Sequence, residues 1–193
     1  MVTIPGFNDD VVALTKAELE AIKAIPDVVP TLREELAMIN PDGDGRNFQE
    51  LLNIPTLNIN GMAAMNVGAM ASNIIPAVAT AALDLRLVKG NTVEGQFNKV
   101  KRFIESKGYT VLDHEPTLEE RKKYKLIAKF TMDEGGYPAQ KTPMDLPIAQ
   151  KVIGAIQTTT AHPVLKIPTV GGSLPLFIFE TILKSPPVTI GMV

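Results

Sequence analysis

The chain has no cysteine among its 193 residues, and no run of apolar residues reaches the roughly 18 that a membrane-spanning helix needs. The lack of cysteine excludes disulfide bonds and thiolate metal sites, and it excludes no redox compartment. The start of the chain has no basic segment followed by a long apolar one, so we expect no signal peptide. We therefore expect a cytoplasmic protein without a membrane partner.

An excess of either charge is also missing, because 19 lysines and arginines stand against 21 aspartates and glutamates. Proteins that bind nucleic acids neutralise backbone phosphates with a basic face. The net charge of −2 and the lack of a basic face lead us to expect no nucleic-acid partner. The one dense basic run, Arg121-Lys122-Lys123, is interpreted as the solvated edge of a hairpin.

Periodicity and capping signals predict an α+β chain of ordinary globular composition, with 45% hydrophobic and 21% charged residues. We expect helices at residues 16–25, 27–38, 47–52, 93–107, 148–157 and 174–183. We expect strands at residues 2–7, 56–60, 78–88, 109–113, 124–132, 164–168 and 188–193. Residues 61–76 are rich in small side chains and have no period, which predicts a long loop of the kind that is usually functional.

The strand at residues 78–88 carries the clearest pattern. Apolar side chains occupy its odd-numbered positions from Ala79 to Leu87. The polar side chains of Thr80, Asp84 and Arg86 occupy even-numbered positions. This alternation predicts a strand with one buried and one exposed face.

A glycine- and proline-rich stretch at residues 133–147 indicates a linker between two units. We predict one unit at residues 1–143, built from antiparallel strands and helices. The other, at residues 144–193, has the strand–helix–strand order that is typical of a parallel α/β unit. Its roughly 50 residues are too few to bury a good core alone, so we expect it to need a partner surface.

Two motifs resemble functional loops but depart from them. Residues 40–45, Asn-Pro-Asp-Gly-Asp-Gly, match the first half of an EF-hand calcium loop, yet its twelfth position is Leu51 instead of glutamate, so we interpret a turn. Residues 171–175, Gly-Gly-Ser-Leu-Pro, resemble a serine nucleophile elbow, but Pro175 replaces its last glycine and no histidine is tied to Ser173 as a base. We interpret this second motif as a helix start whose free N–H groups would bind a carboxylate or phosphate.

The remaining candidates for chemistry are isolated residues. His114 and His162 are interpreted as surface or packing residues, and two separated histidines are too few for a zinc site. Arg86 has two open interpretations. Its guanidinium could form an ion pair with Asp84 on the same strand face, or a fork for a substrate carboxylate.

Three stretches in order resemble the di-zinc metallopeptidase and amidohydrolase family, which includes carnosinases, aminoacylases, bacterial glutamate carboxypeptidases and succinyl-diaminopimelate desuccinylases. They are Asn73-Ile74-Ile75-Pro76, Leu83-Asp84-Leu85-Arg86-Leu87-Val88 and Gly171-Gly172-Ser173-Leu174-Pro175. The opening Gly6-Phe7-Asn8-Asp9-Asp10-Val11 and the stretch Gly136-Tyr137-Pro138-Ala139 are similar to the larger, carnosinase-like members.

The resemblance implies a ferredoxin-like lid, an antiparallel sheet with helices on one face, which forms a homodimer. A small partial α/β segment of the catalytic domain would follow it. By the same resemblance Asn73 lies in a loop that reaches an active site, commonly the partner's. Arg86, Gly172 and Ser173 would bind the carboxylate end of the substrate. Glu134 stands where carnosinases have a histidine before a Gly-Gly pair, and its negative charge would oppose an anionic substrate.

The family's metal ligands, a His-x-Asp motif, a Glu-Glu pair and a final histidine, have no counterpart in this sequence. We therefore expect a piece of a zinc-dependent peptidase that cleaves the amide bond of a dipeptide or N-acyl amino acid. We expect it to supply dimerisation and carboxylate binding, no catalytic residue and no metal ligand, and to be inactive alone. Two zinc ions would bind to the full-length enzyme. The alternative is a non-enzymatic ferredoxin-like dimerisation or small-ligand-binding module.

Overall fold

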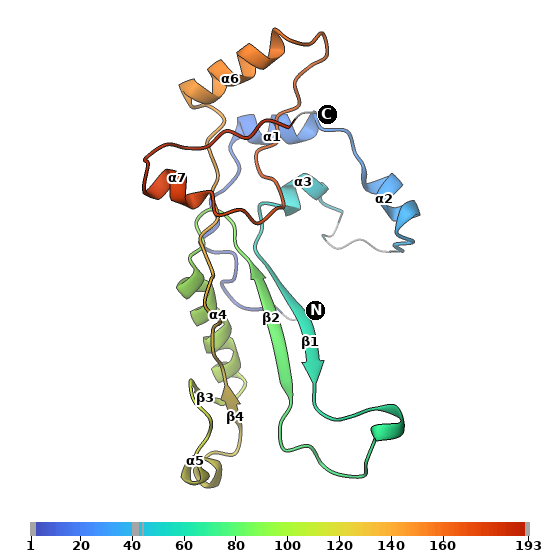
Figure 1. Cartoon of the computed structure of the whole chain (residues 1–193), viewed down its shortest axis with the longest axis vertical. Coiled ribbons are helices and arrows are strands. Elements are labelled where there is room, and N and C mark those ends of the chain that lie inside the picture. The colour runs from blue at the N-terminus through green and yellow to red at the C-terminus, as the bar shows by residue number, and fades with distance from the viewer. Residues whose placement is uncertain (1–2, 40–42, 44, 192–193) are drawn as a thin grey trace.

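The computed structural model describes residues 3–39, 43 and 45–191 (Figure 1). These residues form an α+β fold, which confirms the predicted fold class. Its helices are α1 Lys16–Lys23, α2 Val29–Glu35, α3 Phe48–Leu51, α4 Val93–Ser106, α5 Leu118–Lys123, α6 Pro147–Gln157 and α7 Phe177–Thr181, with a 3-10 turn, η1, at Gly68–Met70. Its strands are β1 Thr56–Ala63, β2 Thr80–Arg86, β3 Thr110–Leu112 and β4 Ile127–Lys129.

The molecule is elongated, with its elements gathered in two regions (Figure 1). Helices α1, α2, α3, α6 and α7 lie in the upper region of the view, while α4, α5 and the four strands lie below them. The connection between β1 and β2, residues 64–79, projects from the lower end, and we call it the arm. No helix of the described residues is long and apolar enough to cross a membrane.

Strands β1 and β2 form an antiparallel ribbon that begins with the pair Thr56–Arg86. Its register shifts between Ile59 and Gly61, so Asn60 is an extra residue in β1. Residues directly opposite each other lie on the same face of a ribbon. Because of the extra residue, one face carries an unbroken series of apolar pairs, namely Leu57–Leu85, Ile59–Leu83 and Met62–Ala81.

The predicted burial of one face of this strand is wrong for the described residues. Residues 80–82 of β2 are exposed and only residues 83–85 are half-buried. On β1, Ile59 and Met62 are 53% and 77% exposed, although both belong to the apolar series. The alternation therefore predicted correctly which side chains share a face of the strand, but few residues pack on the apolar face, so it is largely exposed.

Strands β3 and β4 form a second sheet, which is parallel. The single antiparallel sheet implied by the resemblance is therefore replaced, within the described residues, by two two-stranded sheets. Parallel strands need a crossover connection, and the connection between β3 and β4 contains the helix α5. Thr117 and Glu120 begin α5 with a capping box. The basic run 121–123 forms the last turn of this helix, not the edge of a hairpin.

The helices that were predicted from capping residues begin and end close to those positions. Thr15 and Glu18 form a capping box at the start of α1, and the Thr92 side chain accepts a hydrogen bond from the Gly95 N–H at the start of α4. Gly108 follows α4 with a φ of 88°, the left-handed conformation that ends many helices. Local signals in the sequence therefore predicted where α1 and α4 begin and approximately where they end.

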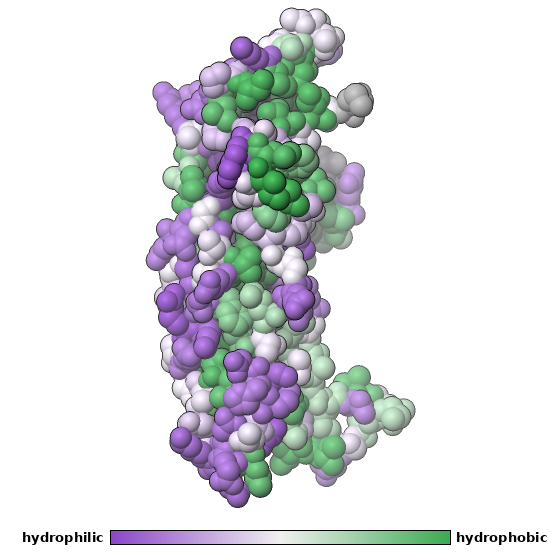
Figure 2. Space-filling model, turned by 60° about the vertical axis from the view of Figure 1, so that its left-hand side comes forward, coloured by the Kyte–Doolittle hydropathy of each residue, from purple (hydrophilic) through white to green (hydrophobic). Residues whose placement is uncertain are grey.

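The buried apolar core of the described residues is small, and it comprises Ile22, Val88, Val100 and Ala149. Figure 2 shows correspondingly broad apolar areas at the surface, mixed with polar ones. In the lower region, the rings of Phe97 in α4 and Phe130 after β4 stack with centroids 4.4 Å apart. This stack joins helix α4 to the parallel sheet.

Several predicted strands are absent from the described residues. Residues 3–7 enter a series of turns, in which Gly6 has a φ of 71° and accepts a hydrogen bond from the Asp9 N–H. Residues 164–168 and 188–191 are irregular, so the predicted parallel α/β unit does not form there. The turn predicted at residues 40–45 lies mostly outside the described residues. The division at residues 143 and 144 stays a prediction.

Candidate carboxylate-binding site

A segment of the C-terminal part lies across the end of the ribbon where β1 begins and β2 ends. We call this segment, residues 169–180, the strap. At its start, the Thr169 hydroxyl donates to the Asn53 side-chain oxygen at 2.7 Å. At its far end, the Glu180 carboxylate binds the Lys89 ammonium. The strap is therefore anchored to residues on both sides of the Thr56–Arg86 pair.

Arg86, the last residue of β2, meets the strap at its middle. Its Nη1 donates to the Ser173 hydroxyl at 2.8 Å, and its Nε donates to Asp84 Oδ2 at 2.6 Å. Asp84 and Arg86 lie on the same face of β2 because side chains two residues apart in a strand do so. These bonds use two of the five donors of the guanidinium, and the Arg86 side chain is 58% exposed. The guanidinium therefore retains donors and access for an anion.

The two interpretations of Arg86 are compatible in this geometry. The ion pair with Asp84 is present, and the guanidinium also reaches Ser173, a residue that the sequence motifs singled out separately. The structure thus brings together Arg86 and Ser173, two of the predicted site residues, which are 87 positions apart in the sequence. Their role as a carboxylate site stays a prediction.

The glycines before Ser173 leave the strap backbone open, and Gly171 lies close to Leu52, which follows α3. A side chain at Gly171 would meet Leu52 at 3.0 Å, so this glycine permits a close approach, whereas a side chain at Gly172 would meet nothing within 4 Å. The predicted helix start at this point is wrong, because α7 begins at Phe177. An anion here would therefore meet an extended loop rather than the end of a helix.

Asn73 and Glu134 occupy different positions relative to Arg86. One extended open groove runs along much of the molecule, and Arg86, Glu134, Gly172 and Ser173 are among its many lining residues. Asn73 is exposed in the arm, which joins β2 at the end opposite to Arg86. The six residue steps of β2 span about 20 Å, so Asn73 does not reach the Arg86 of its own chain.

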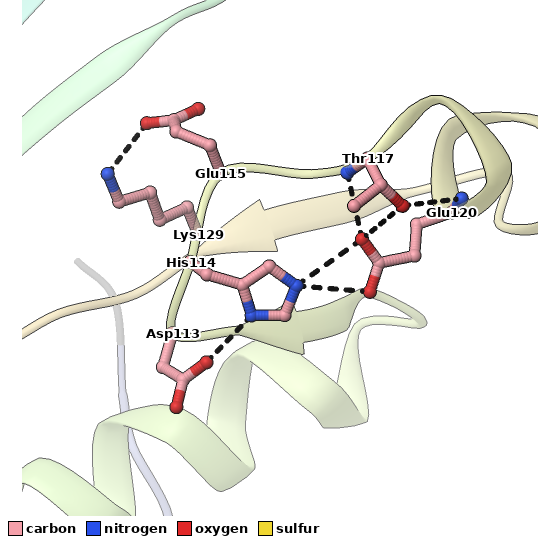
Figure 3. Close-up of polar contacts among 6 residues, drawn as sticks. All are labelled: Asp113, His114, Glu115, Thr117, Glu120 and Lys129. Atoms are coloured by element: carbon pink, nitrogen blue, oxygen red, sulfur yellow. Dashed lines mark hydrogen bonds and ion pairs between the residues drawn. The ribbon is translucent and has the colours of Figure 1, made fainter.

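A polar cluster that the sequence did not indicate lies at the lower end of the molecule, beside α5 (Figures 1 and 3). His114 Nδ1 lies 2.8 Å from Asp113 Oδ1, and its Nε2 lies 3.1 Å from Glu120 Oε1. Glu120 also accepts hydrogen bonds from the backbone N–H and the hydroxyl of Thr117, both at 2.8 Å. The Thr-x-x-Glu spacing at residues 117–120 was the available signal for this cluster.

Hydrogen bonds set the charge state of this cluster. The hydrogen bond to Asp113, followed by the one to Glu120, raises the pKa of His114. The backbone and side-chain hydrogen bonds from Thr117 lower the pKa of Glu120, with a further contribution from His114. His114 is therefore a surface residue whose protonated form is favoured by two carboxylates, each on a different ring nitrogen.

The described residues do not fit a metal centre. Across residues 3–39, 43 and 45–191, no group of three or more His, Asp or Glu side chains is arranged to hold a metal ion. The two carboxylates at His114 approach opposite edges of its ring, so they do not converge with it on one point. His162 lies on an exposed loop.

Comparisons with known proteins agree with this picture. Residues 16–111, from α1 into β3, match the peptidase dimerisation domain of the M20 type. The structure of the M20 family metallo-carboxypeptidase Sso-CP2 from Sulfolobus solfataricus is similar, with 25% identity, a TM-score of 0.68, and coverage of 95% of this chain and 44% of that one. Human carnosine dipeptidase 1 shares the fold, with 21% identity, a TM-score of 0.62, and coverage of 94% and 36%. No curated protein sequence matches the chain.

The class that the fold and these matches define is a peptidase dimerisation domain with an additional C-terminal segment. The chain belongs to the M20 metallopeptidase family, which confirms the resemblance read from its motifs. It spans less than half the length of either of the two structures.

Proposed function

We propose that this chain supplies the dimerisation surface and the substrate-carboxylate site of a zinc-dependent peptidase. The substrate would be a dipeptide or an N-acyl amino acid whose internal amide bond is cleaved. In both, the terminal carboxylate lies at a fixed distance from the amide carbonyl. Holding that carboxylate positions the amide, and positioning alone contributes substantially to catalysis.

The contact between Arg86 and Ser173 is the observation that carries the proposal. It joins the end of β2 to the strap with a 2.8 Å hydrogen bond. A serine hydroxyl that accepts from arginine can still donate its own proton to an anion. Arg86 would supply charge and a planar set of donors, Ser173 a neutral donor, and Gly172 an unobstructed backbone.

The homodimer is proposed to form through the dimerisation domain, with Asn73 reaching the partner's site. The arm supports this idea, because several of its apolar side chains are exposed, including Val67, Met70, Ile74 and Ile75 at 85%, 71%, 66% and 94%. Contiguous exposed apolar residues typically mark an interaction surface. A second copy would also bring an Asn73 to a site that the Asn73 of the same chain does not reach.

The zinc ions are proposed to bind to polypeptide outside these residues, since the described ones do not fit a metal centre. In that arrangement the metal would activate the attacking water. This chain would hold the substrate in place and contribute no nucleophile. By the resemblance, Glu134 stands where carnosinases have a histidine, and its negative charge would oppose the carboxylate of the substrate.

Titration calorimetry with N-acetylglycine tests this proposal, with N-acetylglycinamide as the matched ligand that lacks the carboxylate. We expect the chain to bind the acid in preference to the amide. Arg86→Lys should weaken binding of the acid by about tenfold, because lysine cannot replace a planar fork of donors. Equal binding of acid and amide, or unchanged affinity in Arg86→Lys, would favour the alternative of a non-enzymatic dimerisation module.

A further inference from the structure

We infer that Lys89 and Glu180 form a positioning pair that holds the strap against Arg86 and thereby sets the affinity of the carboxylate site. The inference rests on the proposed function of Arg86 and Ser173. Neither member of the pair is assigned a contact with the substrate. Both act through the position of Ser173.

The pair connects the two segments that carry the site. The Lys89 ammonium lies 2.8 Å from both carboxylate oxygens of Glu180. Lys89 follows Arg86 by three residues, and Glu180 follows Ser173 by seven. The pair therefore spans the same gap as the Arg86–Ser173 hydrogen bond, from the ribbon to the strap.

The ribbon end of this connection is firmly held. The Lys89 carbonyl accepts a hydrogen bond from the Val12 N–H at 3.1 Å. The next residue, Gly90, has a φ of 103°, and a side chain there would collide with the Asp10 carbonyl oxygen. This turn therefore packs directly against residues 10–12, and Lys89 provides a fixed point for the strap.

The strap end depends on contacts with other parts of the molecule. Helix α7, which carries Glu180, has only five residues, and isolated helices of that length are unstable in water. Contacts that hold the strap besides Ser173 include the Thr169–Asn53 hydrogen bond at its start and the stacking of Phe177 on Tyr137, with centroids 5.7 Å apart. Loss of the Glu180 contact should therefore loosen the half of the strap that follows Ser173.

Simple electrostatics and positioning predict opposite results for one substitution. Glu180→Gln removes a negative charge near the site and leaves Lys89 with a neutral acceptor in place of its counter-charge, so electrostatic attraction alone would tighten the binding of an anion. If Glu180 instead positions the strap, the same change should weaken binding, because Ser173 is held less firmly beside Arg86. Lys89→Met weakens binding under both ideas and does not separate them.

The test is titration calorimetry of the full chain with N-acetylglycine, comparing Glu180→Gln, Lys89→Met and the exchanged double variant Lys89→Glu/Glu180→Lys. We expect about threefold weaker binding in each single variant, the scale of a half-exposed ion pair. The exchanged variant should recover affinity to within about twofold, because its ion pair is restored. Lys122→Met, which breaks the Lys122–Glu119 pair on α5, is the matched control and should leave affinity unchanged.

Hydrogen exchange supplies a second measurement that does not depend on ligand. Backbone amides of residues 174–181 should exchange faster in Glu180→Gln, with protection of α4 unchanged. Tighter or unchanged binding in Glu180→Gln, or unchanged exchange in the strap, overturns the inference. If Arg86→Lys loses affinity while Glu180→Gln does not, only the positioning role fails. If Arg86→Lys has no effect, the proposed carboxylate site itself fails.

Discussion

Replacing Glu18 by glutamine should destabilise the chain far more than the same replacement elsewhere in α1. The Glu18 and Lys141 side chains are 4% and 10% exposed, and the Lys141 ammonium lies 2.8 Å from Glu18 Oε1. The other carboxylate oxygen of Glu18 accepts from the Thr15 N–H at 2.8 Å in the capping box. One side chain therefore closes the start of α1 and pairs with a buried cation.

The magnitude follows from which of these contacts glutamine keeps. Its amide oxygen can still cap the Thr15 N–H, so the capping contribution is retained. Lys141 would be left buried without its anion, and breaking a buried pair in this way costs several kcal/mol. With part of the hydrogen bonding preserved, we expect a loss of about 2–3 kcal/mol in the free energy of unfolding.

Urea unfolding followed by circular dichroism is the assay, with Glu20→Gln as the control. Glu20 lies on the same helix and pairs with Lys16, but these side chains are 65% and 91% exposed. Such pairs contribute less than about 0.5 kcal/mol. The double variant Glu18→Gln/Lys141→Met should be closer to wild type than Glu18→Gln alone, because the unpaired cation is gone. Equal losses for Glu18→Gln and Glu20→Gln would refute the reasoning.

The same pair predicts how stability depends on pH. Burial alone would raise the pKa of Glu18, but the hydrogen bond from Lys141, the backbone hydrogen bond of Thr15 and the charge of Lys141 together lower it from 4.5. A carboxyl group with a lowered pKa stabilises the fold above its unfolded value. The contribution of Glu18 should thus be complete above about pH 4.5 and disappear as the pH falls through its folded pKa.

Three further predictions concern other parts of the molecule. The pKa of His114 is raised from 6.5, so the histidine should stabilise the α5 region below pH 6.5 and lose that effect as the pH rises through its folded pKa. Glu120→Gln should lower the pKa of His114 in an NMR titration, and an unchanged pKa would contradict the contact between these residues. Glu134→Gln should tighten binding of N-acetylglycine, whereas weaker binding would show that Glu134 assists the ligand. Ile75→Glu should weaken self-association in sedimentation by about tenfold, while Leu118→Glu, a change at an exposed leucine of α5, should leave it unchanged.

Local chemistry explains which elements could be predicted from sequence. Helices α1 and α4 could be predicted because their ends are set by residues next to them in sequence: the capping residues Thr15 and Thr92 and the terminating Gly108. The start of α7 was misplaced for an equally local reason. Pro175 restricts Leu174 to extended conformations, so the helix begins only at Phe177.

Long-range contacts explain what could not be predicted. The resemblance assigned Arg86 and Ser173 to the same substrate carboxylate, but nothing in either motif specifies a direct hydrogen bond between residues 87 positions apart. The Lys89–Glu180 pair could not be predicted either, because it depends on where the strap crosses the ribbon. The parallel pairing of β3 and β4 depends on α5, and the polar composition of residues 114–123 obscured the capping box that begins this helix.

The extra residue at Asn60 has a consequence for how this part of the chain can change over time. Residues 61–63 pair with residues 82–80 in the same alternation that Ile59–Leu83 begins, so deleting Asn60 would keep Met62 opposite Ala81 and Ala63 opposite Thr80. The facing of the apolar pairs and the entry of the chain into the arm would stay as they are. Asn60 is therefore a position at which β1 can lose one residue without compensating exchanges of apolar and polar residues, whereas a one-residue slip elsewhere in a regular ladder turns the later side chains to the other face.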